Sequence, residues 1–289
     1  MSRPNEPGIL AERLAELRPG GGESTVRAIL QAWPSIRSVR GASAVSRETV
    51  LPGLVFVGFL LAWEFLVPAL GVRAYLLPTP SAIAAAFAAR YPTMLQQLSV
   101  TIGEFLIGFS ATVVAGYLLA LVMAYWTVLE VTFYPYVVAI RSVPVVTLLP
   151  VFIIWFGFGF NSIVVISFLI SFFPMVVNTL SGFKSTDDEL VEMLQSFSAN
   201  RRQVYWHVYR YSTLPSVFAG LKICVILGFT GALVGEFLLG NRGIGFLILS
   251  YNSSLQTPSM FASILTVSAT ELLIFGTIHR LEQAVVDWQ

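Results

Sequence analysis

The stretch KSTDDELVEMLQSFSANRRQVYWHVYRYSTLP, from Lys184 to Pro215, is the one long polar interruption between segments that are apolar enough to lie in a membrane. It contains eight charged side chains and His207, in a chain of 289 residues that has 17 basic and 16 acidic side chains. A membrane protein that concentrates charge in one internal loop presents that loop to water. The partner of this loop should therefore explain what the protein does.

Composition places the chain among polytopic membrane proteins. It is 56% hydrophobic and 11% charged, against about 25% charged in an average soluble domain, and its mean hydropathy is +0.76. The net charge of +1 gives no indication of a nucleic-acid partner. Cys224 is the single cysteine, so the sequence excludes an intrachain disulfide and a cysteine cluster for a metal.

The apolar segments predict an all-α integral membrane fold. A membrane-spanning helix needs about 20 mostly apolar residues. Six segments come close to this length: Leu51–Leu70, Ser99–Trp126, Val143–Phe160, Ser162–Gly182, Ser216–Leu239 and Phe261–Ile278. A shorter helix at 129–141 leads into the third. We therefore expect about six transmembrane helices.

The basic residues predict the orientation, because cytoplasmic loops of membrane proteins carry an excess of Lys and Arg. If the N-terminus is inside, all basic residues except Arg73, Arg90 and Arg242 lie on the inner side. We therefore expect both termini and the Lys184–Pro215 loop to be cytoplasmic.

The polar N-terminal region differs from the rest of the chain. Residues 1–48 contain seven arginines and five acidic residues and lack the apolar core of a signal peptide. We interpret them as a cytoplasmic tail, which either carries interfacial amphipathic helices at 9–17 and 24–33 or is only partly ordered. Residues 49–289 form the membrane domain in this interpretation.

The polar loop itself has the pattern of a helix–turn–helix outside the membrane. Thr186 and Glu189 have the spacing of a capping box, with Thr186 as the N-cap. Leu190, Leu194 and Phe197 then share one helical face. An exposed amphipathic helix of this kind fills a groove in a partner, or it packs against its own helices.

The second half of the loop resumes as a helix. Ser198-Ala199-Asn200 reads as a break, and 201–211 has apolar residues on one side. Pro215 marks the entry to the next span.

At this point the sequence resembles the permease motif of ABC importers, Glu-Ala-Ala-x3-Gly-x9-Ile-x-Leu-Pro. Glu192 stands at the first position, Ser198 at the glycine and Val208 at the isoleucine. Met193 and Leu194 replace the two alanines, and Arg210-Tyr211 replaces Leu-Pro, while a second Leu-Pro survives as Leu214-Pro215.

Further stretches between about residues 75 and 280 resemble the nitrate/sulfonate/taurine/bicarbonate-type branch of these permeases. They are Leu76–Ser81, Arg141–Pro144 with Leu148–Gly157, Phe172–Pro174 with Asn178, Phe218–Lys222, and Gly235–Phe237 with Asn241–Gly245. Glu104 occupies a position where the family usually has arginine.

The resemblance implies a type I ABC importer permease with a coupling segment at 186–211, in the bacterial inner membrane. Its implied partners are two cytoplasmic ATPase subunits that bind ATP and Mg, a second permease copy or paralogue, an extracytoplasmic solute-binding protein and membrane lipid. The residues that it implies in ATPase coupling are Asp188, Glu189, Glu192, Met193, Leu194, Phe197, Ser198 and Arg201.

The chain carries no nucleotide chemistry of its own. No Gly-x4-Gly-Lys-Ser/Thr phosphate loop is present, and neither a Ser/His/Asp set nor a metal cluster is apparent. We therefore expect a permease that is not itself an enzyme and binds no cofactor.

Ionisable and polar residues at membrane depth are candidates for the substrate path, since burying them in lipid is costly. The candidates are Glu64, Asn178, Thr230, Glu236 and Glu271. Glu236 either contacts substrate or holds the exit loop by a hydrogen bond. The mostly apolar lining suits a small organic solute. Within the family, the Gly-Glu-Phe and Asn-Arg-Gly-Ile-Gly stretches favour a pyrimidine or flavin precursor over nitrate.

Two alternatives from other classes remain open at this point. An ion-gradient-driven secondary transporter would use the intramembrane acids as ion sites and show inverted repeats, and no repeat is apparent between the two halves. A membrane scaffold without transport would be compatible with the divergent coupling motif.

Overall fold

The computed structural model describes residues 42–286 of the chain. Within this range all regular elements are helical, which confirms the all-α class. Contacts divide the chain into two units, Met1–Ala62 and Trp63–Gln289, and α3 (Ala42–Ala69) runs from the first into the second. The surface helices predicted at 9–17 and 24–33 lie outside the described residues.

Within the described residues, five helices are long and apolar enough to span a membrane. They are the part of α3 from Val50 to Ala69, α4 (Pro80–Tyr125), α7 (Phe160–Lys184), the helical stretch Arg201–Leu239 that includes α10 (Arg210–Leu239), and α12 (Thr257–Val285). These five confirm the first, second, fourth, fifth and sixth predicted spans.

The third predicted span, Val143–Phe160, is wrong as a continuous helix. After α5 (Thr127–Arg141), the chain forms the short 3-10 helix η2 (Val145–Leu148) and the eight-residue helix α6 (Leu149–Phe156). Pro144 begins η2, and Gly157, at φ 80°, ends α6. Proline lacks the amide donor and glycine adopts positive φ freely, so both interrupt a helix in a segment of high hydropathy.

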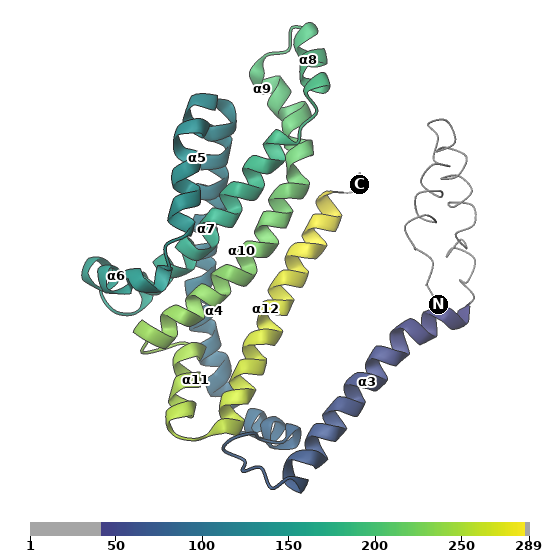
Figure 1. Ribbon diagram of the computed structural model, residues 1–289, viewed down its shortest axis with the longest axis vertical. Coiled ribbons are helices and arrows are strands. Elements are labelled where there is room, and N and C mark those ends of the chain that lie inside the picture. Colours follow the sequence, from purple (N-terminus) through teal and green to yellow (C-terminus); the bar gives the residue numbers. More distant parts are fainter. Residues whose placement is uncertain (1–41, 287–289) are drawn as a thin grey trace, which may run out of the picture. The chain divides into compact units, whose positions relative to one another are not determined.

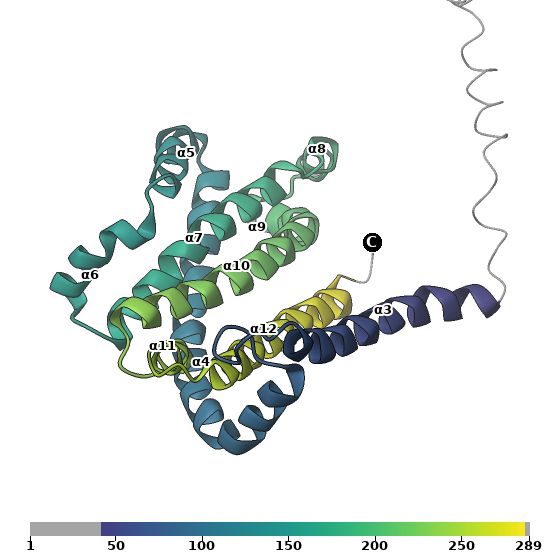
Figure 2. The same ribbon diagram turned by 60° about the horizontal axis from the view of Figure 1, so that its bottom comes forward.

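The second span is longer than predicted, because α4 begins at Pro80 and not at Ser99. Thr79 caps it: its hydroxyl accepts a hydrogen bond from the Ala82 amide at 3.4 Å. A helix of 46 residues is about 69 Å long, more than a bilayer core needs. Pro92 lies inside α4, and the ribbon bends near its start (Figure 2).

In the second unit, α7 lies between α4 and α10 (Figure 1). Small residues make this approach close. A Cβ atom added at Gly116 of α4 would lie 2.8 Å from Cγ of Met175 on α7, and one at Gly231 of α10 would lie 3.0 Å from Cα of Ser167. Buried hydroxyls join the same helices, since Ser167 Oγ donates to the Gly228 carbonyl at 2.8 Å. This pattern is typical of helix packing in membranes.

The polar loop forms α8 (Asp188–Ser196), α9 (Arg201–Val204) and a π-helical turn, η3 (Tyr205–Tyr209), which continues into α10. Two local predictions are wrong. The N-cap is Asp187, whose Oδ1 accepts from the Glu189 amide at 2.9 Å, because the Thr186 hydroxyl bonds Ser212 at 2.6 Å. Pro215 lies inside α10 and not at its start, because the continuous helical stretch already begins at residue 201.

We expect Gly116→Ala to lower the thermal stability of the detergent-solubilised protein. The added methyl group overlaps Met175, and overpacking of this kind costs about 1–3 kcal/mol. Gly103→Ala is the matched control on the same helix, because a Cβ there meets no atom within 4 Å. It should be neutral or stabilising, since alanine is the better helix former. Equal melting temperatures for the two variants would contradict the packing described here.

A second prediction concerns Ser198, which has a φ of 61° in the turn between α8 and α9. A non-glycine residue in this left-handed region costs about 1 kcal/mol, so Ser198→Gly should stabilise the turn. Hydrogen exchange of the α8 amides should become slower. Ser196→Gly, inside α8, should make it faster, because glycine weakens a helix. Faster exchange in Ser198→Gly would contradict the strain argument.

Candidate functional site

The second unit carries two regions of distinct chemistry, joined by the continuous helix from 201 to 239. One is the coupling segment, residues 186–211. The other is the α11 end, which we define as α11 (Ile244–Ser253) together with the loop 240–243 and the parts of α4 and α7 beside it. Figure 1 shows α8 and α11 at opposite ends of α10.

The coupling segment exposes an apolar surface. No residue of α8 is buried, and Leu190, Met193 and Phe197 are 46%, 49% and 76% exposed. Leu190 and Phe197 belong to the predicted face, whose third member, Leu194, is half-buried, and Met193 lies beside them. In the described part of the chain, this face is therefore open to a partner.

The turn after α8 is firmly built. The Ser198 amide donates to the Gln195 carbonyl at 2.9 Å, and Asn200 forms a reciprocal capping box with Gln203 at 2.8 and 2.9 Å. Arg201 then places its guanidinium 5.0 Å from the ring centre of Tyr125 on α4. The turn therefore fixes the position of α8 relative to α9.

All residues predicted to contact an ATPase lie in this one segment. They are Asp188, Glu189, Glu192, Met193, Leu194, Phe197, Ser198 and Arg201. Most are exposed, and Leu194 is half-buried. Their role in coupling stays a prediction.

Aromatic residues tie the second arm of the segment to the membrane helices. The hydroxyls of Tyr205 in η3 and Tyr117 in α4 lie 2.5 Å apart. The ring of Phe183 on α7 stacks on Tyr205, with centroids 6.5 Å apart. Lys184 forms an ion pair with Glu130 of α5. A displacement of η3 would therefore act on α4 and α7 directly.

At the α11 end, a buried carboxylate holds the loop that follows α10. Glu236 is fully buried; it accepts a hydrogen bond from the Thr101 hydroxyl at 2.5 Å and one from the Gly245 amide at 2.5 Å. Thr101 in turn accepts from the Ile244 amide at 2.9 Å. Through these bonds Glu236 holds the exit loop, and its contact with substrate stays a prediction.

Glycine is required where this loop passes the carboxylate. Gly243 has a φ of 95°, and a Cβ atom there would overlap the Glu236 carboxylate. The Gly243 amide also donates to Gln97 Oε1 at 2.7 Å. The backbone before α11 is therefore fixed by side chains of both α4 and α10.

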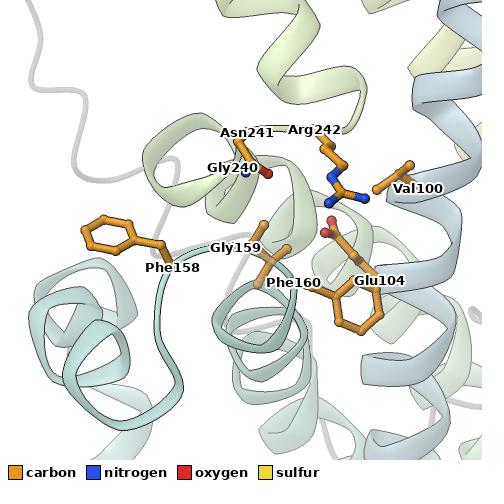
Figure 3. A pocket seen from close by; sticks show the side chains of 9 residues that line it. Val100, Glu104, Phe158, Gly159, Phe160, Gly240, Asn241 and Arg242 are labelled. Atoms are coloured by element: carbon orange, nitrogen blue, oxygen red, sulfur yellow. The ribbon is translucent and has the colours of Figure 1, made fainter.

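A cavity of about 350 Å³ lies beside this loop. Figure 3 shows Glu104 of α4 and Arg242 of the loop pointing toward one another on its walls. Glu104 is 2% exposed, and its side chain lies against that of Glu236. The Oε2 atom of Glu104 has no hydrogen-bond partner within the described residues.

The other residues predicted for the substrate path lie on four different helices. The Glu64 carboxylate accepts from the Ser81 amide at 3.0 Å and from its hydroxyl at 2.6 Å. The Asn178 amide donates to the Pro174 carbonyl at 2.8 Å. Thr230 is exposed and Glu271 is half-buried. Their contact with substrate stays a prediction.

Sequence reasoning missed the partners of Glu236. Glu104 stands out in the sequence only as an acid at a position where the family usually has arginine, and nothing local indicates that it meets a residue of a helix far along the chain. Thr101 and Gln97 share a face of α4 with Glu104, which was the available signal. Among residues 42–286, no group of three or more His, Cys, Asp or Glu side chains is placed to hold a metal ion.

Comparison with known proteins identifies the class to which this architecture belongs. Residues 112–287 match the family model described as binding-protein-dependent transport system inner membrane component. The formylaminopyrimidine transport permease of Halalkalibacterium halodurans is 34% identical over 84% of this chain and 98% of its own length.

Two other relatives have different solutes in their names. The riboflavin transport system permease of Chloroflexus aurantiacus is 32% identical over 80% of this chain and 87% of its own length. The taurine transport system permease of Escherichia coli is 27% identical over 68% of this chain and 71% of its own length.

The family works with ATPase and binding-protein partners in the inner membrane, which agrees with the apolar helices and with the exposed segment between α7 and α10. The chain therefore belongs to the binding-protein-dependent transport system inner membrane component family and is a multi-pass permease component of an ABC importer.

Proposed function

We propose that two copies of this chain, or this chain and a paralogue, form the translocation path for a small organic solute. A solute-binding protein delivers the solute at the α11 end, and two ATPase subunits dock on the coupling segments. The α8 end and both termini face the cytoplasm in this proposal, in agreement with the distribution of basic residues.

The exposed apolar face of α8 carries this proposal. Leu190, Met193 and Phe197 lie outside any membrane-length helix, and each stays about half or more exposed in the described chain. Burying large apolar side chains gains about 25 cal/mol per Å², so a groove in a partner would hold this face. Asp188 and Glu189, in the first turn of α8, make the surface beside this face polar.

The ATPase partners supply the nucleotide chemistry. ATP and Mg bind to these subunits in our proposal, since this chain lacks a phosphate loop. Their closure would displace α8, and Tyr205 would pass that displacement to Tyr117 and to α10. Packed helices move as rigid bodies, so α10 would carry it to Glu236 and the exit loop.

The solute that we propose is a nitrogen heterocycle of the pyrimidine or flavin-precursor type. The two relatives named for a formylaminopyrimidine and for riboflavin are each above 30% identical, whereas the taurine relative is 27% identical. The mostly apolar core of α7 and α10, with a few buried hydroxyls, suits such a solute. Taurine, aliphatic sulfonates, nitrate and bicarbonate are the alternatives that the experiment must include.

We expect the complex purified from its native cells and reconstituted in liposomes to accumulate labelled formylaminopyrimidine when ATP is present on the ATPase side. Vanadate should abolish the uptake. An ionophore that collapses ion gradients should leave it unchanged, because ATP is the energy source. Uptake that requires a gradient and persists without ATP would refute the importer, and taurine uptake alone would refute the solute class.

A separate prediction tests the docking face. Phe197→Ala should weaken binding of the ATPase subunit at least about tenfold, because buried aromatic anchors contribute most of the affinity of an interface. Gln195→Ala is the matched control on the opposite face of α8 and should bind as the parent does. The affinities can be measured by titrating purified ATPase subunit onto the permease in nanodiscs. Equal losses in both variants would contradict the assigned face.

A further inference from the structure

The cavity at the α11 end has walls from three separate parts of the chain. Val100 and Glu104 come from α4, the segment 158–160 leads into α7, and the segment 240–242 follows α10 (Figure 3). Its volume of about 350 Å³ lies within the range of about 300–1,000 Å³ that holds small ligands in proteins. The cavity is therefore large enough for one small organic molecule.

One wall presents an unsatisfied acceptor. Glu104 is almost fully buried, and its Oε2 atom finds no donor among the described residues. A buried polar atom without a partner costs about 1–3 kcal/mol. Most such atoms in native proteins are satisfied, and Glu104 lines the cavity, so its unpaired oxygen points to a donor that arrives with a ligand.

The facing wall presents donors. The guanidinium of Arg242 has five N–H groups and no acceptor, and Figure 3 shows it directed toward Glu104. No ion pair joins these two residues in the described structure, although they lie on the same cavity. A molecule between them would meet an acceptor on one side and donors on the other.

The walls are held in place before any ligand arrives. Glu104 packs against Glu236, and Glu236 accepts from the Gly245 amide. The Gly243 amide, next to Arg242, donates to Gln97. A site built on such fixed groups loses little entropy when it binds. Glu236 is thus a positioning residue for this cavity.

We propose that this cavity binds the transported solute at the α11 end, and that it takes a small planar nitrogen heterocycle with an amino donor and a carbonyl acceptor. The amino group donates to Glu104 Oε2, the carbonyl accepts from Arg242, and the ring lies in the apolar part of the cavity beside Phe160. The assignment rests on the proposed function, since that places the α11 end where solute is delivered.

The test uses the complete transporter in liposomes with two matched probes. One is formylaminopyrimidine, and the other is the same molecule with its ring amino group replaced by methyl. The amino compound should inhibit ATP-driven uptake by the parent transporter at a concentration at least about tenfold lower than the methyl compound does. The reason is that a buried acceptor rejects a ligand that lacks the donor. Glu104→Met removes the acceptor, so the ratio of the two inhibitory concentrations should fall to within about twofold.

Arg242→Gln should weaken inhibition by both probes about equally, since both keep the carbonyl group. Arg73→Gln is the matched control, because Arg73 is an arginine outside the cavity that bonds the Tyr75 hydroxyl at 3.2 Å. It should retain the parent's ratio and affinities. A ratio that stays near the parent's value in Glu104→Met would overturn the proposal, whereas loss of all ATP-driven uptake in the parent would overturn the proposed function.

Photolabelling tests the site without relying on transport or on a variant that folds. A pyrimidine that carries the amino group and an azide should label peptides containing 158–160 or 240–242 in the parent complex, and unlabelled formylaminopyrimidine should prevent this. Label confined to other peptides, or absent, would overturn the proposal. Label would also be absent from these two segments if Arg242 and Glu104 serve only to hold each other.

Discussion

The close approach of three helix backbones is the constraint on which the rest of this structure depends. Lipid tails are as apolar as leucine side chains, so the hydrophobic effect does not drive helices together inside a membrane. Helices in a membrane therefore depend on complementary shape for their contact area. Gly116 lets α4 reach Met175 of α7, and Gly231 lets α10 reach Ser167 on the same helix. Because α7 is shared, the positions of α4 and α10 are fixed relative to each other.

That fixed relation makes the α11 end possible. Thr101 and Glu104 of α4 meet Glu236 of α10 only when both helices stand at the correct depth and rotation around α7. The Glu236 carboxylate then finds enough donors to be buried, and it holds the backbone before α11. A carboxylate without these donors would be too costly at that depth. The same contacts leave Glu104, which lines the cavity, with no hydrogen-bond partner for its Oε2 atom among the described residues.

The opposite end of α10 follows a different physical rule. The helix continues without interruption from the membrane to residue 201, where Asn200 caps it, and α8 projects beyond it. We propose that this end lies in water, where an apolar face has a cost that a partner removes. One helix thus connects a surface that needs a protein partner with a loop that lies beside a cavity. That connection is the mechanical basis for the proposed coupling.

The sequence by itself determined the helical class, five of the membrane spans and the apolar face of α8. These features depend on local composition and on the helical period, which no distant contact has to supply. It also marked Glu236 as a candidate to hold the exit loop. It failed at Val143–Phe160, where proline and glycine outweigh hydropathy, and at the cap of α8, where Ser212 binds the Thr186 hydroxyl.

Only the tertiary structure decided which polar groups meet. Glu104 and Glu236 stand on different helices, and nothing in either local sequence specifies their contact or the cavity with Arg242 beside it. The branch of permeases that the chain resembles usually has arginine at the position of Glu104. The reversal becomes intelligible in three dimensions, because a second cation there would face Arg242 across the cavity and offer no acceptor. Pairings of this kind arise from helix packing, and therefore the sequence pattern of a single helix does not reveal them.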